Sequence, residues 1–96
     1  MALETTLFDP AEFLTDAESV EEYLRSAFED GSPAEIADAL GVVARAHGMS
    51  ALAADTGISR QALYKALNRD GNPGFATIVK VAQALGFKLK AERIGA

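Results

Sequence analysis

Residues 49–68 read MSALAADTGISRQALYKALN, and the pattern of this segment indicates the fold class. It predicts a helix, a turn at Gly57 where glycine tolerates positive φ, and a second helix capped by Ser59. Leu63 and Leu67 lie four residues apart, so both would face the core. This layout is typical of a helix-turn-helix, whose second helix enters the DNA major groove.

The outer face of the second helix carries the candidate DNA contacts. Arg60 and Gln61 stand at its start, and these side chains pair bidentately with guanine and adenine edges. The predicted base-reading residues are Arg60, Gln61, Tyr64 and Lys65. The predicted contacts to the DNA backbone are Ser50, Ser59, Asn68, Arg69 and Asn72. A face that only contacts water would have the same polarity, and the Tyr64 ring could equally pack back on the domain.

The composition narrows the class of protein. A chain of 96 residues makes one domain. It has no cysteine, which excludes disulfides and thiolate metal sites and fits a reducing cytoplasm. No apolar run approaches the ~18 residues of a membrane span, and no secretion signal opens the chain. We therefore expect a cytoplasmic protein without a membrane partner.

Nothing in the sequence predicts an enzyme. Catalysis needs a positioned base beside a nucleophile, or paired carboxylates in a cleft. The acids fall on predicted exposed helix faces and caps, and the single histidine, His47, stands near a helix end. No metal-ligand spacing occurs either. We expect no catalytic residue, no metal and no cofactor.

Charge divides the chain in two. Residues 1–48 hold eleven acids against two arginines, a balance of −9, whereas residues 49–96 hold three acids against seven bases, a balance of +4, which recovers the net charge of −5. The basic half suits phosphate, and the acidic half suits a cationic partner. An acidic face that only keeps the protein soluble would have the same composition.

Helix-capping residues predict two helices before residue 49. Residues 3–8 favour a short strand or an ordered tail, and residues 10–14 a single turn. Thr15 and Glu18 form a capping box that opens a helix ending at about Glu29.

The second of these helices starts at Ser32-Pro33-Ala34-Glu35, where a cap, a first-turn proline and a capping glutamate coincide. Gly48 ends this helix. The stripe expected to face inward consists of Ile36, Ala37, Leu40, Val43 and Ala44.

After the predicted helix-turn-helix, the composition of residues 69–74 predicts a loop. A helix follows from Phe75 to Leu85, and its inward stripe is predicted at Phe75, Ile78, Ala82 and Leu85. Residues 87–94 alternate apolar with charged side chains, as in a strand. A lone strand is unstable in water, so it would pair with the N-terminal segment or with the same strand of a second subunit. This is the first indication of a dimer.

The predicted fold is therefore mainly α, a single domain of about five helices over residues 1–96. Residues 1–31 form an N-terminal extension with an acidic helix, and residues 33–86 form the helix-turn-helix core. Residues 87–94 form a short C-terminal β-strand.

With these motifs the chain resembles the lambda-repressor/Cro-like helix-turn-helix proteins over about residues 33–86. More narrowly, it resembles the addiction module antidote, or DNA-binding prophage protein, family, related to the HigA-like antitoxins. The motifs that carry the resemblance are Phe8-Asp9-Pro10, Tyr23-Leu24, Ala39-Leu40-Gly41, Arg45-Ala46-His47-Gly48-Met49-Ser50, Thr56-Gly57-Ile58-Ser59-Arg60, Leu63-Tyr64-Lys65-Ala66-Leu67, Gly71-Asn72-Pro73 and Ala84-Leu85-Gly86.

The resemblance implies an antitoxin that neutralises a small basic toxin of the RelE/HigB-like, mRNA-cleaving type. It also implies that the protein represses its own toxin–antitoxin operon, as a homodimer on an inverted repeat in double-stranded DNA. Met49 stands where many relatives carry a phosphate-binding glutamine, and Ser50 is expected to replace that contact. Two alternatives remain: a protein-interaction antidote without specific DNA binding, and an orphan prophage transcriptional regulator without a toxin.

Overall fold

The central element of the structure, a computed structural model that describes residues 16–95, is the helix α2 (Pro33–His47). Its buried residues run without a gap from 39 to 44. Six consecutive residues exceed one turn of 3.6, so every side of the helix is covered there. The capping box predicted at its start is confirmed, since the Glu35 N–H donates to the Ser32 hydroxyl (3.2 Å) and the Ser32 N–H to the Glu35 carboxylate (2.7 Å).

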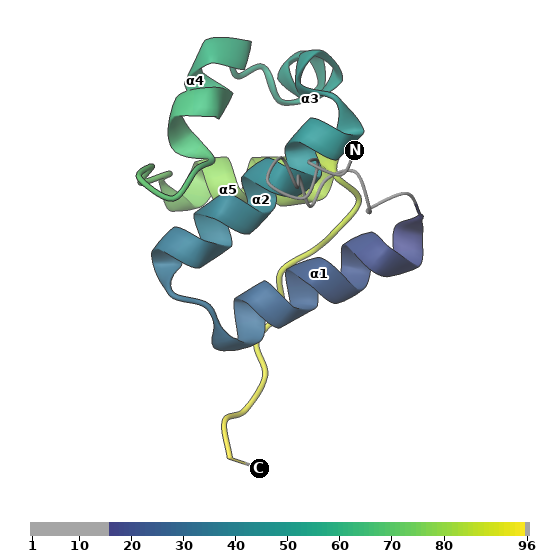
Figure 1. Ribbon diagram of the computed structural model, residues 1–96, viewed down its shortest axis with the longest axis vertical. Coiled ribbons are helices and arrows are strands. Elements are labelled where there is room, and N and C mark those ends of the chain that lie inside the picture. The colour runs from purple at the N-terminus through teal and green to yellow at the C-terminus, as the bar shows by residue number, and fades with distance from the viewer. Residues whose placement is uncertain (1–15, 96) are drawn as a thin grey trace, which may run out of the picture.

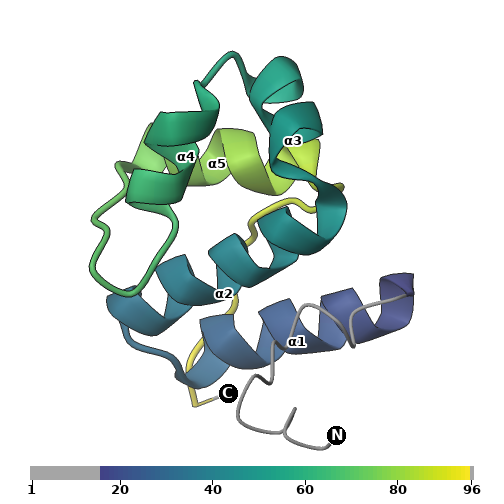
Figure 2. The ribbon, with the colours of Figure 1, turned by 45° about the horizontal axis from the view of Figure 1, so that its top comes forward.

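The other helices lie on two sides of α2 (Figures 1 and 2). α1 (Ala17–Asp30) packs along one side, while α3 (Met49–Thr56), α4 (Arg60–Ala66) and α5 (Phe75–Ala84) gather on the other. The mainly helical class is therefore confirmed. The largest fully buried side chains of the shared core come from four of these helices, one from each: Leu40, Leu52, Leu63 and Val81.

The start of α1 differs from the prediction. Its N-cap is Asp16, whose carboxylate accepts a hydrogen bond from the Ser19 N–H at 2.7 Å. This backbone hydrogen bond favours the charged carboxylate and lowers the pKa of Asp16. The helix therefore begins one residue later than the predicted capping box from Thr15 to Glu18 requires, with Asp16 as its N-cap. Thr15 itself, like the segments 3–8 and 10–14, lies outside the described residues.

The end of the chain also departs from the prediction. Within residues 16–95 there is no β-strand, so the strand predicted at 87–94 is wrong. A strand needs the hydrogen bonds of a neighbouring strand, and the described part of the chain offers none. Phe87 packs against the core and its N–H donates to the Ala82 carbonyl (2.8 Å), but the tail after it runs past α1 with its side chains exposed (Figure 1).

The last helix, α5, places its inward stripe largely as expected, at Ile78, Ala82 and Leu85. Phe75 is the exception, because 75% of its surface is exposed. Phe75 and Ala76 are both exposed and burial along α5 begins only at Thr77, so no other element covers the first two residues of the helix. In the described residues, no helix has the length and apolar character that crossing a membrane requires.

Candidate nucleic-acid interface

The turn between α3 and α4 is fixed by its own hydrogen bonds. Gly57 adopts the left-handed conformation (φ 76°), and its N–H donates to the Ala53 carbonyl at 2.9 Å. The Thr56 hydroxyl donates to the Leu52 carbonyl (2.8 Å) and accepts from the Ile58 N–H (3.2 Å). The glycine turn was predicted from the sequence, but the role of Thr56 was not, although threonine hydroxyls often bond the carbonyl four residues back.

Buried leucines and a cap hold α4 on the domain. The Ser59 hydroxyl accepts from the Ala62 N–H at 3.1 Å, which confirms the predicted cap. Leu63 is fully buried and Leu67 is 3% exposed, as their spacing predicted. The outer face of α4 therefore has a fixed orientation relative to the core.

The far end of α4 is capped by a side chain. The Asn68 amide nitrogen donates to the carbonyls of Tyr64 (2.8 Å) and Lys65 (3.0 Å), and its amide oxygen accepts from the Asp70 N–H (2.8 Å). Asn68 was predicted as a contact to the DNA backbone, and that contact stays a prediction. Within the domain, Asn68 ends the helix and starts the following loop.

A close backbone approach also fixes the position of α4 on α2. A Cβ atom added to Gly41 would collide with the Leu67 carbonyl oxygen and lie 3.0 Å from the carbonyl carbon. Only a glycine lets the two helices come this near.

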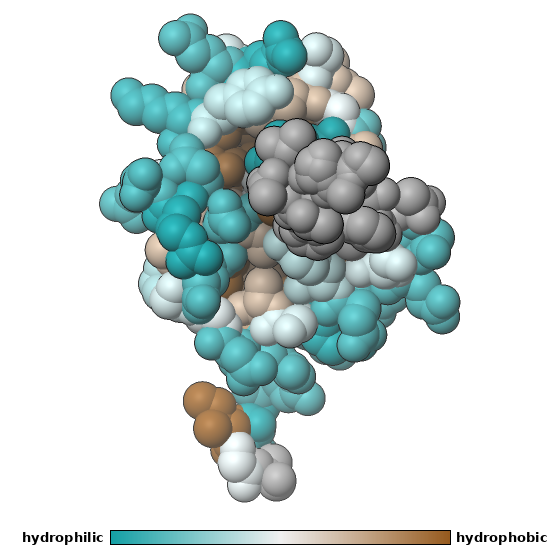
Figure 3. All heavy atoms as spheres, in the orientation of Figure 1, coloured by the Kyte–Doolittle hydropathy of each residue, from teal (hydrophilic) through white to brown (hydrophobic). Residues whose placement is uncertain are grey.

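The predicted base-reading residues share the outer side of α4. Arg60, Gln61, Tyr64 and Lys65 are all exposed, and hydrophilic groups crowd this part of the surface at the upper left of Figure 3. The guanidinium carbon of Arg60 lies 5.6 Å from the centroid of the Tyr64 ring, close enough for a cation–π interaction. α4 contains no acidic residue.

The other predicted contacts do not all join this face. Ser50 on α3 and Asn72 in the loop before α5 are exposed. Met49 is 6% exposed and belongs to the core, so its side chain is not available to phosphate. Arg69 instead lines a hollow of about 310 Å³ whose wall includes three acids of α1 and α2: Asp30, Glu35 and Asp38.

Comparison with known proteins shows what the chain is similar to. Residues 4–93 match the model of a family described as "Probable addiction module antidote protein". The chain belongs to this family. It is also 45% identical over 86 residues to an uncharacterized protein of Haemophilus influenzae, covering 90% of this chain and 89% of that protein. No solved structure matches the chain.

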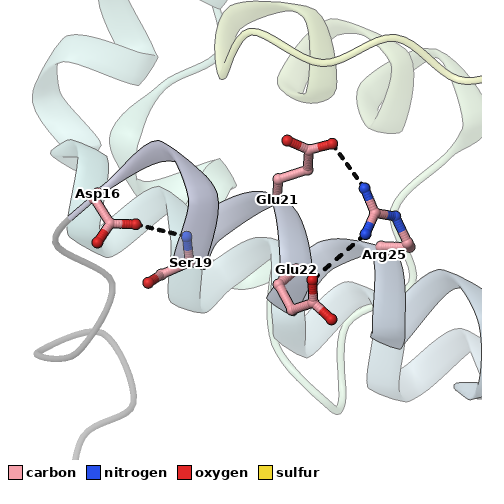
Figure 4. A network of polar contacts seen from close by, with 5 residues as sticks. All are labelled: Asp16, Ser19, Glu21, Glu22 and Arg25. Carbon is pink, nitrogen blue, oxygen red and sulfur yellow. Dashed lines mark hydrogen bonds and ion pairs between the residues drawn. The ribbon is translucent and has the colours of Figure 1, made fainter.

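In this antidote family member, α1 carries a charge opposite to that of α4. Five acids of α1 stand against Arg25 alone: Glu18, Glu21, Glu22, Glu29 and Asp30. Arg25 is held within its own helix, with ion pairs to Glu21 (2.7 Å) and Glu22 (3.4 Å) (Figure 4). The five acids are all exposed. Among residues 16–95, no group of three or more acidic, histidine or cysteine side chains could hold a metal ion.

Proposed function

We propose that this member of the antidote family is a DNA-binding antitoxin that represses its own operon and neutralises a small basic toxin. The proposal that the protein binds DNA rests on Arg60 and Gln61. Both are exposed at the start of α4, and the helix behind them is capped at both ends and anchored by Leu63. α3, the turn and α4 then act as a helix-turn-helix of the lambda-repressor type.

The size and chemistry of α4 support insertion into the major groove. An α-helix with its side chains is about 10–12 Å across, and the major groove is about 12 Å wide, so α4 fits within it. Arg60 would read guanine through O6 and N7, and Gln61 would read adenine through N6 and N7. Tyr64 and Lys65 lie one turn further along the same face.

Backbone contacts would come from the residues that border this face. The Ser59 hydroxyl accepts the cap hydrogen bond and still has its own proton to donate to a phosphate oxygen. Ser50 and Asn72 are exposed and join the proposed set with Asn68. Arg69 belongs to the same set, but its side chain would have to turn from the acid-lined hollow toward the DNA backbone. These contacts position the protein without reading the sequence.

The exposed acids of α1 support binding of a basic toxin. Opposite charge speeds encounter between two proteins and suppresses wrong partners. α1 and α4 lie on opposite sides of α2 (Figures 1 and 2), so one molecule could hold DNA and toxin together. We further propose a cytoplasmic homodimer, whose two α4 helices would fit half-sites about one DNA turn (~34 Å) apart in an inverted repeat.

Fluorescence anisotropy tests the DNA-binding part. A labelled fragment from upstream of the gene is titrated over a range of salt concentrations, with scrambled DNA as the control. We expect tighter binding to the upstream fragment and a steep loss of affinity with salt. Arg60→Ala should cost about 1–3 kcal/mol on the specific fragment and relax the preference at one base position.

Arg93→Ala is the matched control, since it removes the same charge from the exposed tail rather than from α4. Equal loss of affinity in both variants would contradict the placement of the reading face on α4. Equal binding of the wild type to both fragments would contradict specific DNA recognition.

The toxin part is tested with the purified product of the neighbouring gene. Reversing two exposed acids of α1, Glu18→Lys with Glu29→Lys, should weaken the complex and leave DNA binding unchanged. A tight complex without specific DNA binding would favour an antidote that acts only by protein interaction. Specific DNA binding without any complex would favour an orphan regulator.

A further inference from the structure

We infer that Tyr64 is a positioning residue that holds the Arg60 guanidinium ready to read a base. This inference rests on the proposed function, because it explains how the proposed base-reading arginine is prepared for DNA. Tyr64 then acts on recognition through Arg60, in place of a base contact of its own.

The geometry brings the two side chains together on a fixed support. Arg60 and Tyr64 are four residues apart, so they lie on the same face of α4, one turn from each other. The guanidinium carbon is 5.6 Å from the ring centroid, inside the ~6 Å range of cation–π contacts. The backbone beneath them is held by the Ser59 cap, the buried Leu63 and the Asn68 cap.

The kind of contact matters because it leaves the hydrogen-bond donors of Arg60 free. The ring attracts the guanidinium charge through its π face and supplies no oxygen lone pair to the N–H donors. A carboxylate partner would instead occupy those donors.

Arg25 in the same protein illustrates the contrast, since its two terminal nitrogens bond the carboxylates of Glu21 (2.7 Å) and Glu22 (3.4 Å). In the described part of the chain, no carboxylate lies within 4.0 Å of Arg60. Arg60 is therefore restrained without losing the fork that would pair with a guanine edge.

Restraint before binding improves affinity. A free arginine side chain loses rotamer freedom when it is fixed on a ligand, and a side chain that is already restrained loses less. Exposed cation–π contacts are weak, so we expect Tyr64 to improve operator affinity by about two- to fivefold.

The experiment compares Tyr64→Phe, which keeps the ring and loses the hydroxyl, with Tyr64→Leu, which keeps apolar bulk and loses the ring. Tyr64 is 45% exposed, so neither change disturbs the core. In the protein without DNA, ¹⁵N relaxation at Arg60 Nε should give a higher order parameter in the wild type and Tyr64→Phe than in Tyr64→Leu. On the operator, Tyr64→Leu should bind about two- to fivefold more weakly, while Tyr64→Phe should stay close to the wild type.

A double-mutant cycle with Arg60→Ala completes the test. In the Arg60→Ala background, Tyr64→Leu should have no further effect on operator affinity. The same loss in both backgrounds would overturn the inference, because Tyr64 would then contact the DNA itself. A Tyr64→Phe variant as weak as Tyr64→Leu would also overturn it, because the hydroxyl would then be the group that matters.

The relaxation measurement separates this inference from the proposed function. Equal mobility of Arg60 in the wild type and in Tyr64→Leu overturns the positioning role, even where operator binding is specific. Wild-type binding that does not distinguish operator from scrambled DNA overturns the proposed function, even where Tyr64 does restrain Arg60.

Discussion

Replacing Gly41 by alanine should displace α4 from α2. The added Cβ would overlap the Leu67 carbonyl oxygen and would lie 3.0 Å from the carbonyl carbon and 3.5 Å from Leu67 Cβ. The atoms in the way are mainly backbone, so no side-chain rotation relieves the overlap. The C-terminal end of α4 must move away, and the packing of Leu63 and Leu67 in the core moves with it.

The magnitude follows from two opposing effects. Overpacking of a well-packed core costs about 1–3 kcal/mol, and the upper part of that range applies because backbone must shift. Alanine in place of glycine within a helix returns about 1 kcal/mol. We therefore expect the free energy of unfolding to fall by about 2 kcal/mol, which in a domain of this size lowers Tm by roughly 10 °C.

Urea denaturation followed by far-ultraviolet circular dichroism measures this change. The control is Gly74→Ser, because a Cβ at Gly74 has no atom within 4 Å and the N-cap of α5 has no side-chain hydrogen bond. A serine there should leave stability unchanged or raise it by a few tenths of a kcal/mol, roughly. A Gly41→Ala protein as stable as the wild type would refute the close approach of α2 and α4.

Three further predictions concern the ends of helices. Gly57→Ala should lower the free energy of unfolding by about 1–2 kcal/mol, measured in urea, because alanine is strained at φ 76°. Asp16→Ala should destabilise the protein at neutral pH. The lowered pKa of Asp16 means that its contribution is present above the ordinary value of 3.8 and is lost as the pH falls, so denaturation curves of variant and wild type should converge in acid. Asn68→Ala should cost roughly 1 kcal/mol by loss of its hydrogen bonds, with faster amide exchange at the end of α4.

Much of the candidate site could be predicted from the sequence because its geometry is local. The Gly57 turn, the Ser59 cap and the inward Leu63 and Leu67 each depend on residues within about one helical turn. The pairing of Arg60 with Tyr64 follows the same four-residue spacing, although it was not among the predictions. Which of these exposed side chains contact DNA stays a prediction.

The structure of the tail and the position of Arg69 depend on contacts between parts of the chain that are far apart in sequence. The period-2 pattern of residues 87–94 resembles a strand, but a strand forms only where another strand supplies its hydrogen bonds. Arg69 lies three residues after the end of the basic helix α4, but the loop that contains it places its side chain beside the acids of α1 and α2.

Caps, glycines and proline predict the ends of the helices α2 to α5 to within about two residues, because these residues act on their immediate neighbours. The requirement for glycine at position 41 comes from tertiary packing, since the Leu67 carbonyl that Gly41 contacts is 26 positions further along the chain. The tertiary arrangement also leaves Phe75 exposed despite its place in an apolar stripe, because burial requires a neighbouring element to cover the side chain, and none covers the first two residues of α5.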